Sequence, residues 1–444
     1  MMRGYFILMA CVVMASCSVQ KEIGRSAEKN LFSDPTLANA HIGISIYDTE
    51  SGKYLYSHQQ NKFFVPASNT KIFTCYAAMK YLGDSLPGIK YMEAADSVYL
   101  FPTGDPTLLH KDFERQPVIR FLQQQTKPLS ISSSTWRDNA LGYGWTWSDY
   151  NSSYMAERSP LPVYGNLIRF VQTQQVNQTE NKDEPIIYTE PDINWKLNFN
   201  PDPTTRTFSV RRNMAENVFR VTTGNEKQQK EQAVPFVTHG LQSAIELLKD
   251  TVYKDIAISN FQLPGPDLEF RTIYSQKTDS MLTPMMHVSD NFHAEQSLLM
   301  VSNTVLGYMD ADRIIDTLLK GDLKELPQKP RWVDGSGLSR YNLFTPQDFV
   351  WVLNRMRTEF SFERIKLIFP TGNEGTLNNY YVSARDFIYA KTGTLSGQLA
   401  LSGYLITRKN KLLIFSVLVN NHNGSAPAIR RQVEAFLLGI RDKY

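Results

Sequence analysis

The sequence predicts a mixed α/β fold in which two distant parts of the chain build one sheet and a long β-rich segment interrupts them. Strand patterns occur in pairs near residue 50 and near residue 410, and each pair is flanked by helical patterns. Residues 86–265 instead hold short alternating strands, turn clusters and polar tracts. We therefore expect an α/β domain in two segments, 31–85 and 266–444, with β-rich accessory domains inserted at 86–265.

Composition limits the function classes. The chain has 444 residues, of which 42% are hydrophobic and 20% are charged, as in soluble globular proteins with more than one folded unit. Its net charge is +3, the two signs are interspersed, and no basic stripe is interleaved with aromatic residues. We therefore expect no nucleic-acid partner.

The N-terminus has the pattern of an export signal. Arg3 precedes the apolar run 5–14, and small residues follow it, which is typical of a signal peptide and too short for a spanning helix. The sequence Ala15-Ser16-Cys17 resembles the cleavage box of bacterial lipoproteins, with Met14 in place of the more usual Leu. We expect removal of residues 1–16, a lipid on Cys17, a polar tether over 17–30, and a periplasmic protein anchored to a membrane. A plain secretion signal is the alternative.

The local patterns predict individual elements. Apolar residues with a 3.6-residue period, including Ile72, Cys75 and Met79, predict a helix that starts near Ser68 and ends before Gly83. Cys75 lies on its apolar face, where we expect it to pack in the core. The other predicted strands are 41–47, 53–58, 207–211, 217–221, 401–406 and 411–419, and the other predicted helices are 239–250, 291–301, 311–319, 346–357 and 426–440.

A serine three residues before a lysine is the first candidate for chemistry. The pattern occurs at Ser18 with Lys21, at Ser26 with Lys29, and at Ser68 with Lys71. The first two pairs fall in the expected tether, whereas the third opens an apolar helix, so that its two side chains share one face.

Two further motifs support the third pair. Ser289-Asp290-Asn291 follows it in the chain, and the single Lys-Thr-Gly, Lys391-Thr392-Gly393, comes before the strand predicted at 401–406. The ordered trio is the motif set of penicillin-binding proteins and class A β-lactamases.

These residue types suit acyl transfer. The hydroxyl of Ser68 needs a base before it can attack a carbonyl, and Lys71 is that base only when it is neutral. Lys391 is expected to supply the cation that keeps Lys71 neutral and to hold a substrate carboxylate. Ser289 is expected to relay a proton to the leaving amine, and Asn291 to bind a substrate amide. The Ser68 amide and an amide just after Lys391-Thr392-Gly393 are expected to form an oxyanion hole.

Taken together, the motifs resemble one family along nearly the whole mature chain. It is the low-molecular-mass class C penicillin-binding proteins of the D-alanyl-D-alanine carboxypeptidase/endopeptidase type, peptidase family S13. Besides the trio, the resemblance rests on Pro66–Lys71, Gly104–Leu108, Asp334–Arg340, Gly375–Leu377, Lys391–Leu395 and Ser402–Tyr404.

The resemblance implies a fold and a reaction. It implies a transpeptidase-like α/β domain in two segments, an acyl-enzyme on Ser68, cleavage of D-Ala-D-Ala or of peptide cross-links in peptidoglycan, and acylation by β-lactams. It also implies that the Thr394 amide is the second oxyanion donor and that the hydroxyls of Thr392 and Thr394 contact the substrate carboxylate, next to Gly393. No cofactor is implied, and carboxypeptidase and endopeptidase action both stay open.

Other candidates have weaker support. Asp149 lies among aromatic residues and is a candidate partner for the free amine of a peptidoglycan stem, although a structural role is favoured. We expect the stretch 334–340 to be a turn-rich scaffold. His287, His293 and Glu295 do not have the spacing of a zinc peptidase, so no metal site is predicted. The alternative functions are a catalytically idle peptidoglycan- or β-lactam-binding protein and, less favoured because of the large insert, a β-lactamase.

Overall fold

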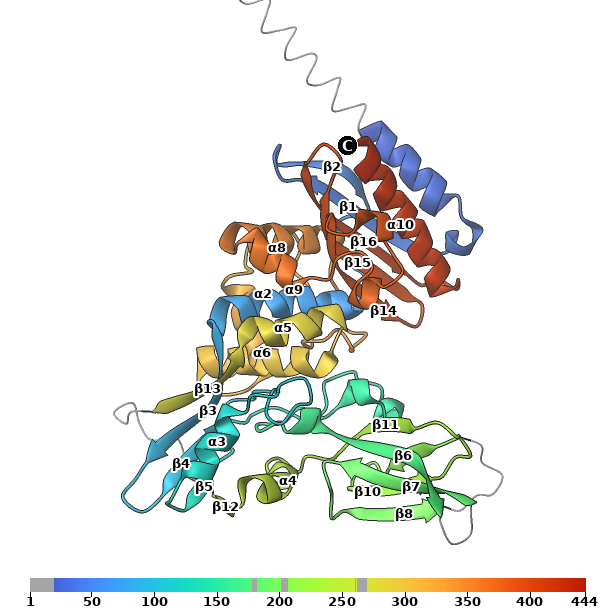
Figure 1. Cartoon of the computed structure of the whole chain (residues 1–444). Helices are drawn as coiled ribbons and strands as arrows, with labels where there is room; N and C mark the ends of the chain where they lie inside the picture. Colours follow the sequence, from blue (N-terminus) through green and yellow to red (C-terminus); the bar gives the residue numbers. More distant parts are fainter. Residues whose placement is uncertain (1–19, 178–181, 201–206, 260, 262–269) are drawn as a thin grey trace, which may run out of the picture. The chain divides into compact units, whose positions relative to one another are not determined.

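The described chain divides into two compact units. The structure is a computed structural model that describes residues 20–177, 182–200, 207–259, 261 and 270–444 (Figure 1). The first unit comprises the described residues up to Ala77 together with Leu282–Asp290 and Ile315–Tyr444, and the second comprises Ala78–Met281 and Asn291–Ile314. The predicted domain limits at 86 and 265 stay a prediction.

The first unit is built on one five-stranded antiparallel sheet in the order β14-β15-β16-β1-β2. Its central pairing joins the two ends of the chain, because His41 in β1 lies opposite Asn420 in β16. The expectation that the strands near residues 50 and 410 share a sheet is therefore confirmed. The strands are β1 (His41–Asp48), β2 (Lys53–His58), β14 (Ile388–Leu395), β15 (Gln398–Ile406) and β16 (Leu412–Asn420).

Helices cover both faces of this sheet (Figure 1). The C-terminal helix α10 (Ala426–Lys443) buries an apolar stripe against one face, and α8 (Pro346–Glu359) packs on β16, β1 and β15. The N-cap of α8 is Thr345, whose hydroxyl accepts from the Asp348 amide, and proline occupies its first turn, as the sequence predicts. The remaining helices of this part of the chain are α2 (Lys71–Tyr81), α5 (Thr278–His287), α7 (Ala311–Lys320) and α9 (Phe362–Ile368).

The segment expected as a tether is folded over most of its length. Residues 20–27 are helical, and the π-helix Glu28–Phe32 continues them. Ile23, Ala27 and Leu31 are buried in the same core cluster as α10. This helix was not predicted, because its stability comes from packing against a tertiary partner rather than from local helix propensity.

The second unit is β-rich, as the sequence predicts, and its described residues form three sheets. Their strand orders are β12-β5-β4-β3-β13, β11-β6-β7 and β8-β10-β9. The two ends of the insert meet in the first of these sheets, where β3 and β13 pair in antiparallel fashion. The hairpin that the sequence predicts is formed by β9 and β10. The strands are β3 (Ser85–Glu93), β4 (Val98–Pro102), β5 (Leu129–Ile131), β6 (Leu167–Asn177), β7 (Lys182–Glu190), β8 (Lys196–Asn200), β9 (Ser209–Arg212), β10 (Val218–Thr222), β11 (Lys230–Pro235), β12 (Ile256–Ile258) and β13 (Arg271–Lys277).

Helices of the second unit pack on its sheets. α4 (Gln242–Val252) shares a core cluster with β6 and β11, and α3 (Pro117–Gln124) contributes Val118, Ile119 and Leu122 to it. The long buried helix α6 (Asn291–Leu306) begins two residues after Ser289. Among the described residues, no helix combines the length and apolarity needed to cross a membrane.

Candidate active site

Ser68 and Lys71 lie at the N-terminal end of α2, which is hydrogen-bonded to the central sheet. A 3-10 turn, Ala67–Thr70, carries Ser68 and leads directly into α2 at Lys71. Ala67 adopts φ 49°, a left-handed conformation that non-glycine residues seldom take outside constrained sites. The turn is tied to the sheet because Asn69 Nδ2 donates to Ser402 Oγ in β15 at 2.7 Å.

Lys71 is completely buried and is aimed at the serine. Its Nζ lies 3.1 Å from Ser68 Oγ and donates to the carbonyl oxygen of Ser336 at 2.8 Å. Ser68 itself is half-buried, so its hydroxyl is reachable while its neighbour is shielded from water. This geometry places an amine within hydrogen-bond reach of a serine hydroxyl, which is the arrangement that a base and a nucleophile require.

The loop that contains Ser336 is a scaffold, as the sequence predicts. The buried carboxylate of Asp334 accepts from the backbone amides of Gly337 and Ser339 at 2.8 and 2.6 Å and from Asn342 Nδ2 at 2.7 Å. Gly337 has φ +82°, and a Cβ there would lie 1.9 Å from the Ala67 carbonyl oxygen, so only glycine fits. The loop thus fixes the carbonyl that holds Lys71.

A second buried lysine is paired with the second motif serine. Lys391 in β14 donates from Nζ to Ser289 Oγ and to the Thr392 carbonyl oxygen, both at 2.9 Å. Ser289 stands in the turn before α6 with φ 66°, another left-handed residue. Burial, the charge of Lys71 and the charge of Arg430 together lower the pKa of Lys391 well below its ordinary value.

The strand β14 brings the Lys-Thr-Gly motif beside the serine turn. At Gly393 a Cβ would come within 2.6 Å of the Pro66 carbonyl oxygen, which explains the need for glycine. Thr392 Oγ1 donates to Thr376 Oγ1 at 2.7 Å, and Arg430 Nη2 donates to Thr394 Oγ1 at 2.7 Å. Thr394 is exposed, so its hydroxyl is accessible to a ligand.

Two other predicted residues, Asn291 and Asp149, belong to the second unit. Asn291 opens α6 and belongs to the second unit, where its Nδ2 donates to the Tyr154 carbonyl oxygen at 3.0 Å. Asp149 also lies in the second unit, at the end of a short 3-10 turn, Trp147–Asp149, and is half-buried. Cys17 lies outside the described residues.

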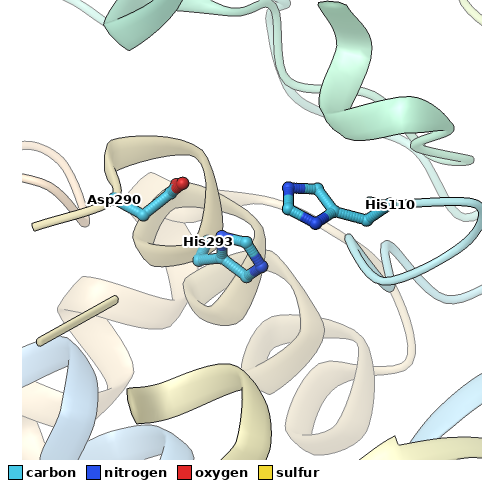
Figure 2. A group of neighbouring side chains, drawn as sticks. All are labelled: His110, Asp290 and His293. Atoms are coloured by element: carbon cyan, nitrogen blue, oxygen red, sulfur yellow. The ribbon is translucent and has the colours of Figure 1, made fainter. Parts of the chain in front are cut away.

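Two histidines of the second unit lie close together although they are distant in sequence. The rings of His110 and His293 are 4.9 Å apart in an edge-to-face arrangement, with His293 buried in the first turn of α6 (Figure 2). Asp290 is the residue directly before this helix. Spacing in the sequence could not reveal the His110–His293 pair, and the prediction that there is no metal site stays a prediction.

Sequence reasoning missed three features of the site. It did not predict β14 as a strand, because Ile388–Leu395 is interrupted by Lys, Thr and Gly rather than alternating. It did not identify the carbonyl of Ser336, since every residue has a backbone carbonyl and the sequence does not show which one contacts Lys71. It also missed Arg430, whose only signal was a cation in the first two turns of the last helix.

Comparisons with known proteins agree with these features. Residues 26–438 match the model of the D-Ala-D-Ala carboxypeptidase 3 (S13) family. The chain is 27% identical to a D-alanyl-D-alanine carboxypeptidase of Actinomadura sp. (strain R39), over 89% of this chain and 81% of that protein. It is 22% identical to a penicillin-sensitive carboxypeptidase A of Dictyostelium discoideum, over 86% and 83%.

Solved structures confirm the expected fold. Penicillin binding protein 4 from Haemophilus influenzae superposes with a TM-score of 0.71 at 17% identity, covering 92% of this chain and 97% of that one. The same protein in complex with a novel β-lactam gives a TM-score of 0.65 at 16% identity, with the same coverage. The α/β sheet in two chain segments with a β-rich insert is therefore the fold of this chain.

Proposed function

The chain belongs to the D-Ala-D-Ala carboxypeptidase 3 (S13) family, and we propose that Ser68 is the nucleophile through which it acts. The protein is a serine DD-peptidase, a hydrolase of peptidoglycan peptides. The observation that carries the assignment of Ser68 is its 3.1 Å contact with the buried Nζ of Lys71. The pair Lys391–Ser289 supports it, since it supplies a second cation and a second hydroxyl in the same unit.

Proton transfer between the two lysines prepares the attack. Burial and then the charge of Lys71 lower the pKa of Lys391, so two neighbouring ammonium groups are disfavoured here, and the pair is proposed to carry one positive charge when the substrate binds. The terminal carboxylate of a substrate, bound beside Lys391, favours the charge on Lys391 and leaves Lys71 neutral. Neutral Lys71 then takes the proton of the Ser68 hydroxyl.

Acylation and deacylation follow. Ser68 Oγ bonds to the carbonyl carbon of the penultimate D-alanine, and the C–N bond to the last residue breaks. The leaving nitrogen receives a proton through Ser289, whose hydroxyl is held by Lys391. Water then attacks the ester, which releases the acid and returns the proton to Ser68. The amides of Ser68 and Thr394 are proposed to hold the oxyanion, with each donor worth about 3 kcal/mol.

Substrate binding is assigned to the residues around β14. Thr392, Gly393 and Thr394 are proposed to receive the substrate carboxylate, and Asn291 to bind a substrate amide. Asp149 is proposed as a contact for the free amine of the stem peptide. In a peptide cross-link, the carbonyl of D-alanine is joined to an amine of a neighbouring strand instead of to the last D-alanine. Attack on this carbonyl is the same reaction, so endopeptidase action needs no further chemistry. Product analysis after digestion of purified peptidoglycan measures the two activities separately.

Acylation by a β-lactam tests the nucleophile. Benzylpenicillin presents a strained amide at the position of the scissile bond, so Ser68 is expected to form a stable ester with it. Mass spectrometry of the intact protein, followed by peptide mapping, should place one ring-opened adduct on Ser68. The absence of an adduct, or an adduct on another residue, would refute the assignment. Release of D-alanine from a synthetic stem pentapeptide then measures peptidase action directly.

The N-terminal segment is proposed to export the protein and to anchor it through a lipid on Cys17. The support is the order of Arg3, the apolar run 5–14 and the small residues before Cys17. Expression with a labelled fatty acid should give a labelled protein that sediments with membranes. Cys17→Ser should abolish the label, and an unchanged label would contradict the anchor.

A further inference from the structure

Two histidines and an aspartate converge beside the first turn of α6. His293 lies in that turn, Asp290 is the residue directly before the helix, and His110 comes from the segment between β4 and α3 (Figure 2). One potential ligand atom from each of the three lies within 4.8 Å of the other two. Within the part of the chain that the structure describes, no other three histidine, cysteine, aspartate or glutamate side chains meet this condition.

The two histidines are held together by the fold of one unit. His110 and His293 both belong to the second unit, and His293 is completely buried there. Asp290 is only three positions from His293 along the chain, so the start of α6 sets the distance between them. Figure 2 shows the Asp290 carboxylate directed toward the two rings. The three donors therefore do not depend on how the two units are placed.

The imidazole rings already have the separation that a shared ion requires. Their centroids are 4.9 Å apart, and their planes are inclined at 76°. A tetrahedral zinc ion holds its nitrogen ligands at about 2.0–2.1 Å, which places two bound rings about 5 Å apart. The two ligand atoms of the group that are farthest apart need to approach by about 1.5 Å, which a rotation of side chains can supply.

His110 also has a carboxylate beside its other nitrogen. Its Nδ1 accepts from the Asp112 amide at 3.3 Å and lies 3.8 Å from Asp112 Oδ2, so Nε2 is the nitrogen that can face an ion. Metal-bound histidines almost always donate their second ring N–H to a carboxylate, a carbonyl or water. When Nε2 binds a metal, Nδ1 carries the proton and turns from the Asp112 amide to the carboxylate of the same residue.

A buried carboxylate favours positive charge on the other side of the group. Asp105 accepts from the amide and the hydroxyl of Thr107 at 2.9 and 2.8 Å. Burial raises the pKa of the Asp105 carboxyl, and the charge of His293 acts in the opposite direction, so these two side chains interact. A cation bound at His293 is therefore stabilised by Asp105 as well as by Asp290.

We propose that His110, Asp290 and His293 bind a divalent transition-metal ion of the zinc type, with water completing its coordination. Two imidazoles and one carboxylate suit such an ion, whereas magnesium and calcium prefer oxygen ligands. The proposal departs from the expectation of no metal site, because His110 is distant in the sequence from the other two. Asp290 stands between Ser289 and Asn291, so the ion holds the turn that carries both motif side chains.

Titration with zinc alone tests the site. The purified protein is treated with EDTA, transferred to metal-free buffer and titrated with zinc chloride in a calorimeter. We expect one ion per chain with a Kd of about 1 μM or lower, and an unfolding temperature raised by about 5 °C in excess zinc. Magnesium chloride at the same concentration should change neither quantity. Absence of saturable zinc binding, or an equal response to magnesium, would overturn the proposal.

Matched variants locate the ion. His110→Ala removes one imidazole, Asp290→Asn removes the negative charge at nearly constant shape, and each should raise the Kd for zinc at least about tenfold. The control is His239→Asn, which removes an exposed histidine of the same unit outside the group and should leave Kd unchanged. His293 is kept because it is completely buried, and thermal unfolding in EDTA shows whether each variant is folded. Equal zinc affinity in the three variants would place the ion elsewhere and refute the site.

Discussion

The pairs Ser68–Lys71 and Ser26–Lys29 have the same spacing, and both lie in helical segments of the first unit, yet only one has the geometry of a reactive pair. Lys71 is completely buried, and its Nζ lies 3.1 Å from Ser68 Oγ. Lys29 is exposed, and Ser26 Oγ instead accepts from Asn30 Nδ2 at 3.2 Å.

The difference is one of environment. A lysine in water keeps its proton at neutral pH, so it cannot act as a base. Burial beside a second buried lysine disfavours a positive charge on Lys71. The carbonyl oxygen of Ser336 accepts a hydrogen bond from Lys71 Nζ and so orients it. The spacing therefore brings the two side chains together, and the surrounding core supplies the environment that the proposed base needs. Four experiments test this contrast.

The largest effect is expected from Ser68→Ala. Loss of the nucleophile removes the covalent route, and D-alanine release should fall by at least about a thousandfold, with no penicillin adduct. The matched control is Ser26→Ala, which should keep both within about twofold. Retention of the adduct by Ser68→Ala would contradict the assignment.

The second-largest effect is expected from Lys71→Ala. Without its base the serine hydroxyl keeps its proton, and acylation by benzylpenicillin should slow by about a hundredfold to ten-thousandfold in stopped-flow or quenched assays. Lys29→Ala serves as the control and should acylate at the wild-type rate. Since removal of a buried lysine can disturb packing, thermal unfolding of both variants should be measured. Normal acylation by a folded Lys71→Ala protein would exclude Lys71 as the base.

The pH dependence of activity reports on Lys391. A lowered pKa means that Lys391 loses its proton, and with it the anchor for the substrate carboxylate, at a lower pH than the ordinary 10.5. The rate of D-alanine release at low substrate concentration should therefore fall on the alkaline side with a midpoint below 10.5. In Lys391→Gln this limb should disappear while the remaining activity is low. A wild-type midpoint at or above 10.5 would show that the buried environment does not act on this group.

The smallest effect is expected from Arg430→Gln. Arg430 contacts Thr394 Oγ1, and its charge lowers the pKa of Lys391. Its loss should raise KM about threefold to tenfold with little change in kcat, and it should move the alkaline midpoint upward because one neighbouring cation is gone. The control is Arg431→Gln, whose arginine pairs with Glu434 at 2.6 Å instead. An unchanged midpoint in Arg430→Gln would exclude an electrostatic role.

Much of the architecture was predictable because local signals were strong. A mostly apolar stretch before Gly83 marks the helix after Ser68, Thr345-Pro346 marks the start of α8, alternation marks β1, and a continuous apolar run marks β16. β14 was not predicted, since the residues that the site requires replace the alternating pattern there. The helix at residues 20–27 was not predicted either, because it depends on packing with α10.

The sequence by itself identified the residues that are proposed for the chemistry. Ser68, Lys71, Ser289 and Lys391 stand in motifs whose order and spacing are specific enough to indicate acyl transfer. Only the tertiary structure decided that Lys71 is buried against Ser336, that Lys391 reaches Ser289, and that Arg430 reaches Thr394. The physical reason is that burial, and the pKa shifts that it causes, depend on which distant segments pack together. A short motif does not specify that packing.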